Sequence, residues 1–289
     1  MTVLGEAPGR PALRYYGGKW RLAPWIISHF PPHRIYVEPY GGAASVLLRK
    51  PRSYAEVYND SWGCVVDFFR VLRDPLMAKV LEDRLRLTPF ARVEFEEARR
   101  PSDDLIENAR RLLVRSFMGF GAASVTPGHQ SGFRNNCRRS GTTGAHDWAS
   151  WPDNVAALTA RLAGVCIENR LALDVICTFD SVETLFYVDP PYPWSTRGSG
   201  PRDEYVFEMD DEAHVLLAGR LHGLRGMCVV SGYDCSLYRD LYRGWESVRC
   251  VARADGSGAR TEVLWISPRA SAAMVQRGFD YHEQIQRSL

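Results

Sequence analysis

The chain has 289 residues, of which 45% are hydrophobic and 24% charged, and its formal net charge is +2. This composition is typical of a globular protein with one large domain or two ordinary ones, and no apolar run is long enough to span a bilayer. Residues 1–11 lack an apolar core after a basic start, so we do not expect a signal peptide. The seven cysteines are odd in number and scattered, which argues against a disulfide framework or a zinc site and favours a reducing cytoplasm.

The first predicted unit is a strand, a small-residue turn and a helix. The strand covers residues 35–38, the turn covers 39–45, and the helix starts at Val46. Small residues in such a turn let the backbone approach a ligand at the helix N-terminus, as in nucleotide-binding α/β proteins. The sequence G-x-G-x-x-G is absent here, which argues against a dinucleotide as that ligand.

A second strand is predicted at 54–58 and ends in Asn59-Asp60. An acid about 20 residues after a glycine turn is in the position expected to bind ribose hydroxyls. The alternative is that Asp60 caps the helix that follows. We expect this helix to take Ser61 as its N-cap and to bury an apolar stripe at i, i+3/i+4 spacing.

The sequence changes character between residues 74 and 153. Segments rich in charge and leucine predict amphipathic helices at 76–87, 93–100 and 103–117, and the Gly-, Ser-, Thr-, Asn- and Arg-rich segment 119–144 predicts loop. Afterwards we expect helices at 156–162, 174–179 and 211–224 and strands at 165–168, 185–188, 227–231 and 261–267. The pattern predicts one α/β domain made of residues 1–73 and 154–289, with 74–153 as a helical, loop-rich insert.

The tetrapeptide Asp189-Pro190-Pro191-Tyr192 follows the apolar strand 185–188. Two prolines cannot continue a sheet ladder, so the chain turns at the carboxyl edge of the sheet, where open α/β sheets bind ligands. A carboxylate, a proline carbonyl and an aromatic ring together suit a flat base with an exocyclic amino group. A loop without function is the alternative for the tetrapeptide taken alone.

Together these motifs resemble those of the Dam-like N6-adenine DNA methyltransferases of the α group, DPPY type. The resemblance rests on four segments in the order of that group: 15–19 (YYGGK), 36–45 (YVEPYGGAAS), 59–60 (ND) and 189–192 (DPPY). Tyr15 stands where the family usually has Trp, and Tyr40 where Phe is more frequent, so both positions keep an aromatic ring. The resemblance implies a Rossmann-like methyltransferase fold with seven strands, and it makes the insert the DNA target-recognition domain.

The resemblance also implies S-adenosylmethionine as methyl donor, S-adenosylhomocysteine as product, and no metal. The cofactor contacts that it implies are Tyr15, Lys19, Glu38, Pro39, Gly41, Gly42, Asp60 and Asp189. The catalytic residues that it implies are Asp189, Pro190 and Tyr192. Asp189 and the Pro190 carbonyl would accept hydrogen bonds from the adenine amino group, while Tyr192 would stack on a base flipped out of the duplex. We expect Asp234, Glu262 and His214 to be structural, because this mechanism has no role for them.

The run 131–139 in the insert contains no acid and combines Arg and Asn with Gly and Ser. Arg and Asn suit recognition of guanine and adenine edges, although a basic loop that contacts only phosphates has the same composition. The DNA-contacting residues that we predict are Lys19, Arg134, Asn135, Asn136, Arg138 and Arg139.

The sequence therefore predicts a site-specific enzyme that methylates the N6 amino group of adenine in double-stranded DNA. One alternative methylates the N4 amino group of cytosine, and another is a DNA-binding relative without catalysis. No cysteine follows a proline, which argues against methylation of cytosine at a ring carbon. We expect a cytoplasmic protein of a bacterium or a phage-infected host, without a membrane partner. A monomer is expected, with a dimer on DNA as the alternative.

Overall fold

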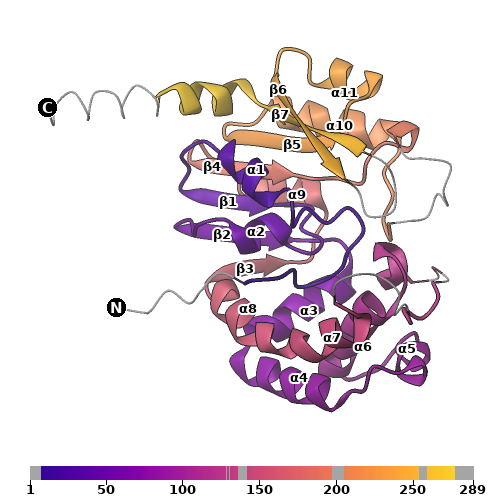
Figure 1. Ribbon diagram of the computed structural model, residues 1–289. Coiled ribbons are helices and arrows are strands. Elements are labelled where there is room, and N and C mark those ends of the chain that lie inside the picture. The colour runs from indigo at the N-terminus through magenta and orange to yellow at the C-terminus, as the bar shows by residue number, and fades with distance from the viewer. Residues whose placement is uncertain are drawn as a thin grey trace, which may run out of the picture.

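A seven-stranded sheet forms the centre of the molecule, and its strand order is β3-β2-β1-β4-β5-β7-β6 (Figure 1). The computed structural model describes residues 8–127, 129, 131–135, 142–196, 205–253 and 259–276. The strands are β1 (Ile35–Glu38), β2 (Ala55–Asn59), β3 (Val165–Glu168), β4 (Thr184–Val188), β5 (Met227–Tyr233), β6 (Glu246–Arg253) and β7 (Ala259–Ile266). The first five pair in parallel, whereas β7 runs antiparallel to both of its neighbours. This confirms the predicted Rossmann-like, seven-stranded α/β fold.

Helices cover both faces of the sheet. They are α1 (Ala23–Ser28), α2 (Ser45–Arg49), α3 (Gly63–Arg73), α4 (Pro75–Leu87), α5 (Arg92–Glu97), α6 (Leu105–Met118), α7 (Gly144–Ser150), α8 (Val155–Leu162), α9 (Ala172–Thr178), α10 (Asp211–His222) and α11 (Ser236–Leu241). Short 3-10 helices lie at η1 (Ala122–Val125), η2 (Trp151–Asn154) and η3 (Trp194–Thr196). Within the described ranges, no helix is long and apolar enough to cross a membrane.

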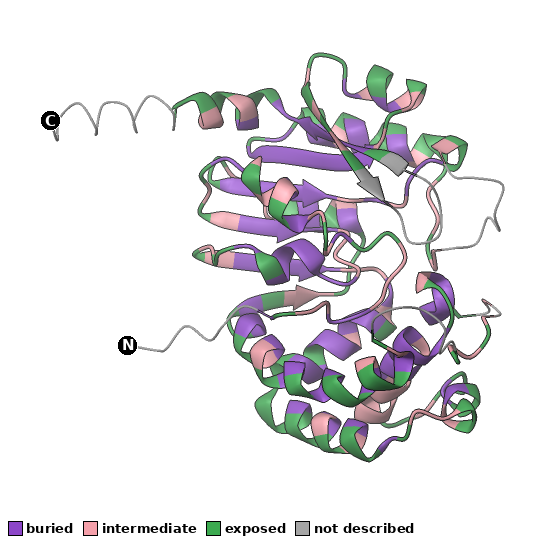
Figure 2. Ribbon diagram, viewed as in Figure 1, coloured by how far each residue is buried: buried purple, intermediate pink, exposed green. Residues whose placement is uncertain are grey.

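Alternate residues of the strands enter two separate hydrophobic cores, because successive side chains of a strand point to opposite faces. Tyr36 and Leu185 pack with α1, α2, α3 and α8 on one face, while Val37 and Phe186 pack with α9, α10 and α11 on the other. Both faces are thus covered, and the central strands are buried along their length (Figure 2). Burial on both faces explains why β4 has the uninterrupted apolar sequence from which it was predicted.

The helices between residues 74 and 153 lie at the β3 end of the sheet (Figure 1). Their buried side chains, such as Leu81 on α4 and Leu112 on α6, belong to the same core cluster as Val65 on α3 and Leu158 on α8. The core therefore continues from the sheet into this helical part. The boundaries at 74 and 153 remain a prediction.

One local prediction is wrong, and one strand was missed. Trp62, not Ser61, is the N-cap of α3, because the Asp60 carboxylate accepts the Trp62 N–H and turns the chain one residue later than expected. Strand β6 was not predicted at all. It forms the edge of the sheet, and Val251 on it is 72% exposed, so its sequence lacks the apolar pattern of a buried strand.

Candidate active site

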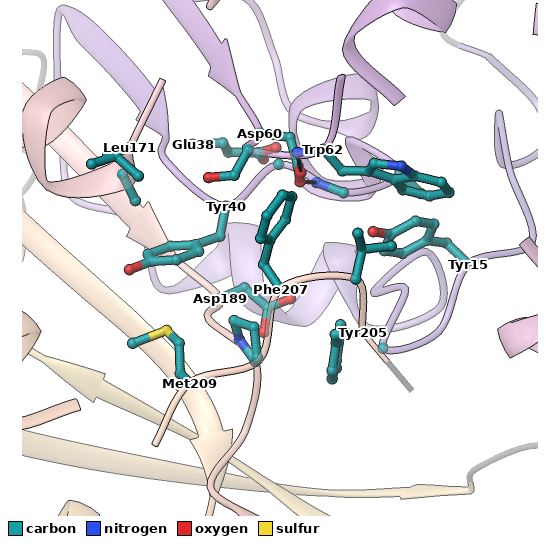
Figure 3. A pocket seen from close by; sticks show the side chains of 18 of the residues that line it. Tyr15, Glu38, Tyr40, Asp60, Trp62, Leu171, Asp189, Tyr205, Phe207 and Met209 are labelled. Carbon is teal, nitrogen blue, oxygen red and sulfur yellow. Dashed lines mark hydrogen bonds between the residues drawn. The ribbon is translucent and has the colours of Figure 1, made fainter. Parts of the chain in front are cut away.

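A pocket of about 690 Å³ opens at the carboxyl ends of β1, β2 and β4 (Figure 3). A volume of this size is typical of sites for small molecules and cofactors. Segments far apart in the sequence line it, namely 15–19, 40–43, 60–62, 169–174 and 205–209, together with Glu38, Ser45, Val46, Tyr187, Asp189, Pro191 and three residues of α10. The structure thus brings all four predicted motifs to one cavity.

The turn after β1 is shaped by two glycines and a buried acid. A Cβ on Gly41 would overlap the Tyr58 ring, and Gly42 has a φ of +47°, in the left-handed region that favours glycine. Glu38 accepts hydrogen bonds from the Leu47 N–H at 2.7 Å and from the Tyr36 hydroxyl at 2.6 Å. Burial raises the pKa of Glu38 to about 7. Glu38 therefore anchors the start of α2 in addition to lining the pocket.

Asp60 connects this turn to the next one. Its Oδ2 accepts the Gly42 N–H and its Oδ1 accepts the Trp62 N–H, both at 2.8 Å. Burial raises the pKa of Asp60, although the backbone N–H groups oppose that shift. Asp60 is thus not the helix cap that was the alternative, because Trp62 is the N-cap of α3. Each carboxylate oxygen has a second lone pair, so Asp60 can hold these two turns and still accept hydrogen bonds from a ligand.

Lys19 is only 6% exposed and lies among groups from three parts of the chain. Its Nζ is 3.0 Å from Asp189 Oδ1 and 3.7 Å from Glu262 Oε1, and it donates to the Gly17 carbonyl at 2.8 Å. It also lies 4.7 Å from the centre of the Tyr192 ring. These neighbours place Lys19 in one cluster with Asp189, Tyr192 and Glu262, and its contact with DNA stays a prediction.

Tyr192 packs deeply behind Asp189 and is only 5% exposed. Its hydroxyl donates to Glu262 Oε1, and the Ser231 hydroxyl donates to the same oxygen at 2.8 Å. The Tyr233 ring meets the Tyr192 ring edge-on, with 4.7 Å between their centres. In this state Tyr192 is not among the residues lining the pocket, so stacking on a base requires that its ring be uncovered.

The pKa values of both Asp189 and Lys19 are raised, for different reasons. Burial raises the pKa of Asp189 to about 6, opposed by Lys19 and reinforced by Glu262. Burial disfavours the Lys19 ammonium, but the two carboxylates outweigh this effect and raise the pKa of Lys19. A perturbed carboxyl at the rim of a cavity is characteristic of functional sites.

The remaining predicted cofactor and catalytic residues divide into two groups. Tyr15 lines the pocket and packs 6.3 Å from Trp62, centre to centre. Pro39 and Pro190 are buried but do not line the pocket, and the Pro39 carbonyl accepts from Asn59 Nδ2 at 2.8 Å. Within the described part of the chain, no group of three His, Cys, Asp or Glu side chains could hold a metal ion.

The predicted DNA-binding run is described only in part. Asn136, Arg138 and Arg139 lie outside the described residues, and Asn135 is exposed. Arg134 Nη1 donates to Asp147 Oδ2 at 3.1 Å, and its backbone N–H donates to the Met118 carbonyl. A role of Arg134 in contacting bases remains a prediction, and such a contact would have to compete with Asp147.

Sequence analysis missed two features of the site. The segment 205–209 crosses the pocket, and the ring of Phe207 projects into it while remaining 55% exposed (Figure 3). Glu262, which we expected to be purely structural, meets the catalytic cluster from β7 and is 3% exposed. The signal for Glu262 was one acid directly before the apolar residues 263–266 of the strand.

Residues 15–124 match the family of D12 class N6 adenine-specific DNA methyltransferases. Over these residues the chain is similar to this family. The match includes the 15–19, 36–45 and 59–60 motifs and reaches into the helical part, and it confirms the family predicted from the sequence. Two proteins named DNA adenine methylase, from two strains of Vibrio cholerae serotype O1, are each 24% identical over 256 residues. These alignments cover 81% of this chain and 85% of each relative.

Proposed function

We propose that this adenine-specific DNA methyltransferase takes its methyl group from S-adenosylmethionine and acts on adenine flipped out of double-stranded DNA. The observation that carries the proposal is the position of Asp189. It lies at the end of β4, at the rim of the pocket that Asp60 and the 41–43 turn also line. The two Vibrio cholerae relatives are both named DNA adenine methylase, which supports adenine as the base.

The residues of the pocket fit this cofactor. Asp60 offers carboxylate lone pairs at a strand end, which suits the two hydroxyls of a ribose. Tyr15, Trp62 and Phe207 supply aromatic surface in the same cavity, which suits an adenine ring. When bound, this cofactor would supply a sulfonium methyl for the adenine amino nitrogen. The sulfur would keep the electron pair of the broken S–C bond, and the amino nitrogen would lose one proton to water.

Asp189 then has two tasks at the amino group. Its carboxylate, together with the Pro190 carbonyl, accepts hydrogen bonds from the two N–H groups, which favours the tetrahedral nitrogen and disperses its developing positive charge. Lys19, at 3.0 Å, holds the carboxylate in place. Alignment of the amino group with the methyl provides much of the acceleration, because the reaction needs no covalent enzyme intermediate.

The helical part supplies the second partner, DNA. We propose that the run 131–139 enters the major groove of DNA, because it carries Arg and Asn and its described residues, 131–135, are fixed to the helices. Phe133 packs against Phe90 and Phe95, with ring centres 5.0 and 6.1 Å apart. A cytoplasmic location and a monomeric state stay part of the proposal.

The experiment incubates purified protein with DNA and S-adenosylmethionine carrying a labelled methyl group, and then analyses the nucleosides by mass spectrometry. We expect labelled N6-methyladenine from the parent and none from Asp189→Asn. Labelled N4-methylcytosine would support the cytosine alternative and refute ours. Binding of cofactor and DNA without any transfer would indicate a relative that has lost catalysis. Sequencing of the modified bases then identifies the target site.

A further inference from the structure

We propose that Glu262 is a positioning residue for methyl transfer, which acts through Tyr192 and through the ion pair of Lys19 with Asp189. The inference rests on the proposed function and deepens it. Glu262 touches neither DNA nor cofactor in the arrangement described above, so its effect must pass through these three side chains.

The first argument is the choice of partners. A carboxylate that is 3% exposed is costly unless hydrogen bonds and charges compensate its burial. For Glu262 this compensation comes from the hydroxyls of Tyr192 and Ser231 and from the Lys19 ammonium at 3.7 Å. Tyr192 and Lys19 both belong to motifs of the active site, so a purely structural acid would have no reason to bind them.

The second argument is geometric. Strand β7 runs antiparallel to β5, and the register pairs Glu262 with Tyr233 at the carboxyl end of β5. This brings Glu262 to the edge of the sheet where β4 delivers Asp189 and Tyr192. By accepting the hydrogen bond of the Tyr192 hydroxyl, Glu262 fixes the far end of the ring, while the Tyr233 ring meets the same ring edge-on. The ring is therefore held in one orientation before a base arrives.

The third argument is electrostatic. With Lys19 alone, Asp189 would form a neutral ion pair whose carboxylate is a weak acceptor. Glu262 shares the same ammonium, at 3.7 Å against 3.0 Å for Asp189, so the cluster of three charges has a net charge of −1. A net negative cluster stabilises the positive charge that develops on the amino nitrogen during transfer.

The pKa of Asp189 reports its electrostatic coupling to Glu262. The groups that face it are Lys19 before α1, Glu38 on β1, Tyr187 on β4, Tyr192 after β4, Glu262 on β7 and Tyr238 on α11, while Tyr233 on β5 faces Lys19. Glu262 raises the pKa of Asp189, and protonated Asp189 is a poorer acceptor for the amino N–H and no longer offers a negative charge to the amino nitrogen. Removing the charge of Glu262 should therefore extend activity to lower pH while reducing its maximum.

The test compares the parent with Glu262→Gln, which keeps the size of the side chain and an oxygen for the Tyr192 hydroxyl. We expect kcat to fall about tenfold while KM for S-adenosylmethionine changes less than about twofold. In the profile of kcat against pH, we also expect the acidic limb to move about one pH unit lower, because one charge near a buried carboxyl is removed. Unchanged kcat together with an unmoved limb would overturn the proposal.

Asp234→Asn is the matched control. Asp234 follows β5 at the same edge of the sheet, but it pairs with Arg239 at 2.8 Å and Arg249 at 3.5 Å. The variant also removes one negative charge, and we expect it to leave kcat and the acidic limb as in the parent. If Asp234→Asn moved the limb as far as Glu262→Gln, any nearby charge would suffice, and the specific role of Glu262 would be refuted.

Tyr192→Phe provides a second route if Glu262→Gln does not fold, which a melting curve would reveal. It removes only the hydroxyl that donates to Glu262, and we expect a loss of kcat of about fivefold to tenfold. A kcat within twofold of the parent would overturn the proposal. When both single variants fold, the double variant should lose less than the product of the two single losses, because the residues act through one contact.

The two proposals fail in different ways. A parent protein that transfers no methyl group to DNA overturns the proposed function and this inference with it. An active parent whose Glu262→Gln variant shows the same kcat and the same pH profile overturns the inference alone.

Discussion

Replacing Asp60 by alanine separates its two roles, because one affects folding and the other affects the cofactor. In the fold, its carboxylate accepts the Gly42 and Trp62 N–H groups, each at 2.8 Å. A hydrogen bond to a charged group contributes about 1.5–3 kcal/mol, and water from the pocket can replace part of this acceptor. We therefore expect Asp60→Ala to lower the free energy of unfolding by about 2 kcal/mol.

The second role concerns the ribose of the cofactor. If Asp60 accepts both ribose hydroxyls, its removal costs about 3 kcal/mol of binding, which raises the dissociation constant on the order of a hundredfold. Asp74→Ala is the matched control. Asp74 also accepts two backbone N–H groups, from Leu76 at 2.9 Å and Met77 at 3.0 Å, but it caps α4 outside the pocket. It should lower stability without changing cofactor affinity.

Thermal melting and calorimetric titration with S-adenosylmethionine measure the two effects on the same samples. The expected result is a lower melting temperature for both variants and weaker cofactor binding for Asp60→Ala alone. If Asp60→Ala loses stability but binds the cofactor within about twofold of the parent, Asp60 only shapes the turns, and the ribose assignment is refuted.

Further predictions concern catalysis and recognition. Asp189→Asn should abolish methyl transfer while leaving the fold intact, and activity within tenfold of the parent would contradict its catalytic role. Because burial raises the pKa of Asp189 to about 6, the parent's kcat should fall as the pH drops below that value, whereas a profile flat to about pH 5 would show that its carboxylate is not needed. Tyr192→Ala should weaken retention of the flipped base by about 1–3 kcal/mol, more than Tyr192→Phe, in a binding assay with fluorescent base analogues. Arg134→Ala should relax specificity at one base pair by about 1–3 kcal/mol, whereas Arg138→Ala should weaken binding to all sequences alike, and methylation of a random library distinguishes the two outcomes.

The inner parallel strands β1, β2, β4 and β5 could be predicted because they are buried on both faces. Strand β4 is buried at all of its positions, and its apolar run ends abruptly in two prolines. The carboxyl ends of parallel strands share one edge, so the motifs after β1, β2 and β4 could be placed together without knowledge of a single contact. The pocket confirms this placement for Gly41, Asp60 and Asp189.

The segment 205–209 was beyond the reach of the same reasoning. It lies outside helices and strands, so neither a period of 2 nor one of 3.6 marks the side chains that face the pocket. Tyr205 and Phe207 both line the cavity, and their aromatic character alone would equally suit a core position. Only the path of the backbone across the pocket reveals which side of this segment contacts a ligand.

Glu262 was missed for a different reason, namely the direction of a strand. Strand β7 was predicted, but a parallel β7 would have placed Glu262 at the amino edge of the sheet, far from Asp189. Because β7 instead runs antiparallel between β5 and β6, its N-terminal half lies at the carboxyl edge. An acid early in this strand therefore reaches the Lys19 ammonium, and the same acid late in the strand could not. In a sheet with one reversed strand, the carboxyl edge of the parallel strands can thus include residues from the beginning of the reversed strand.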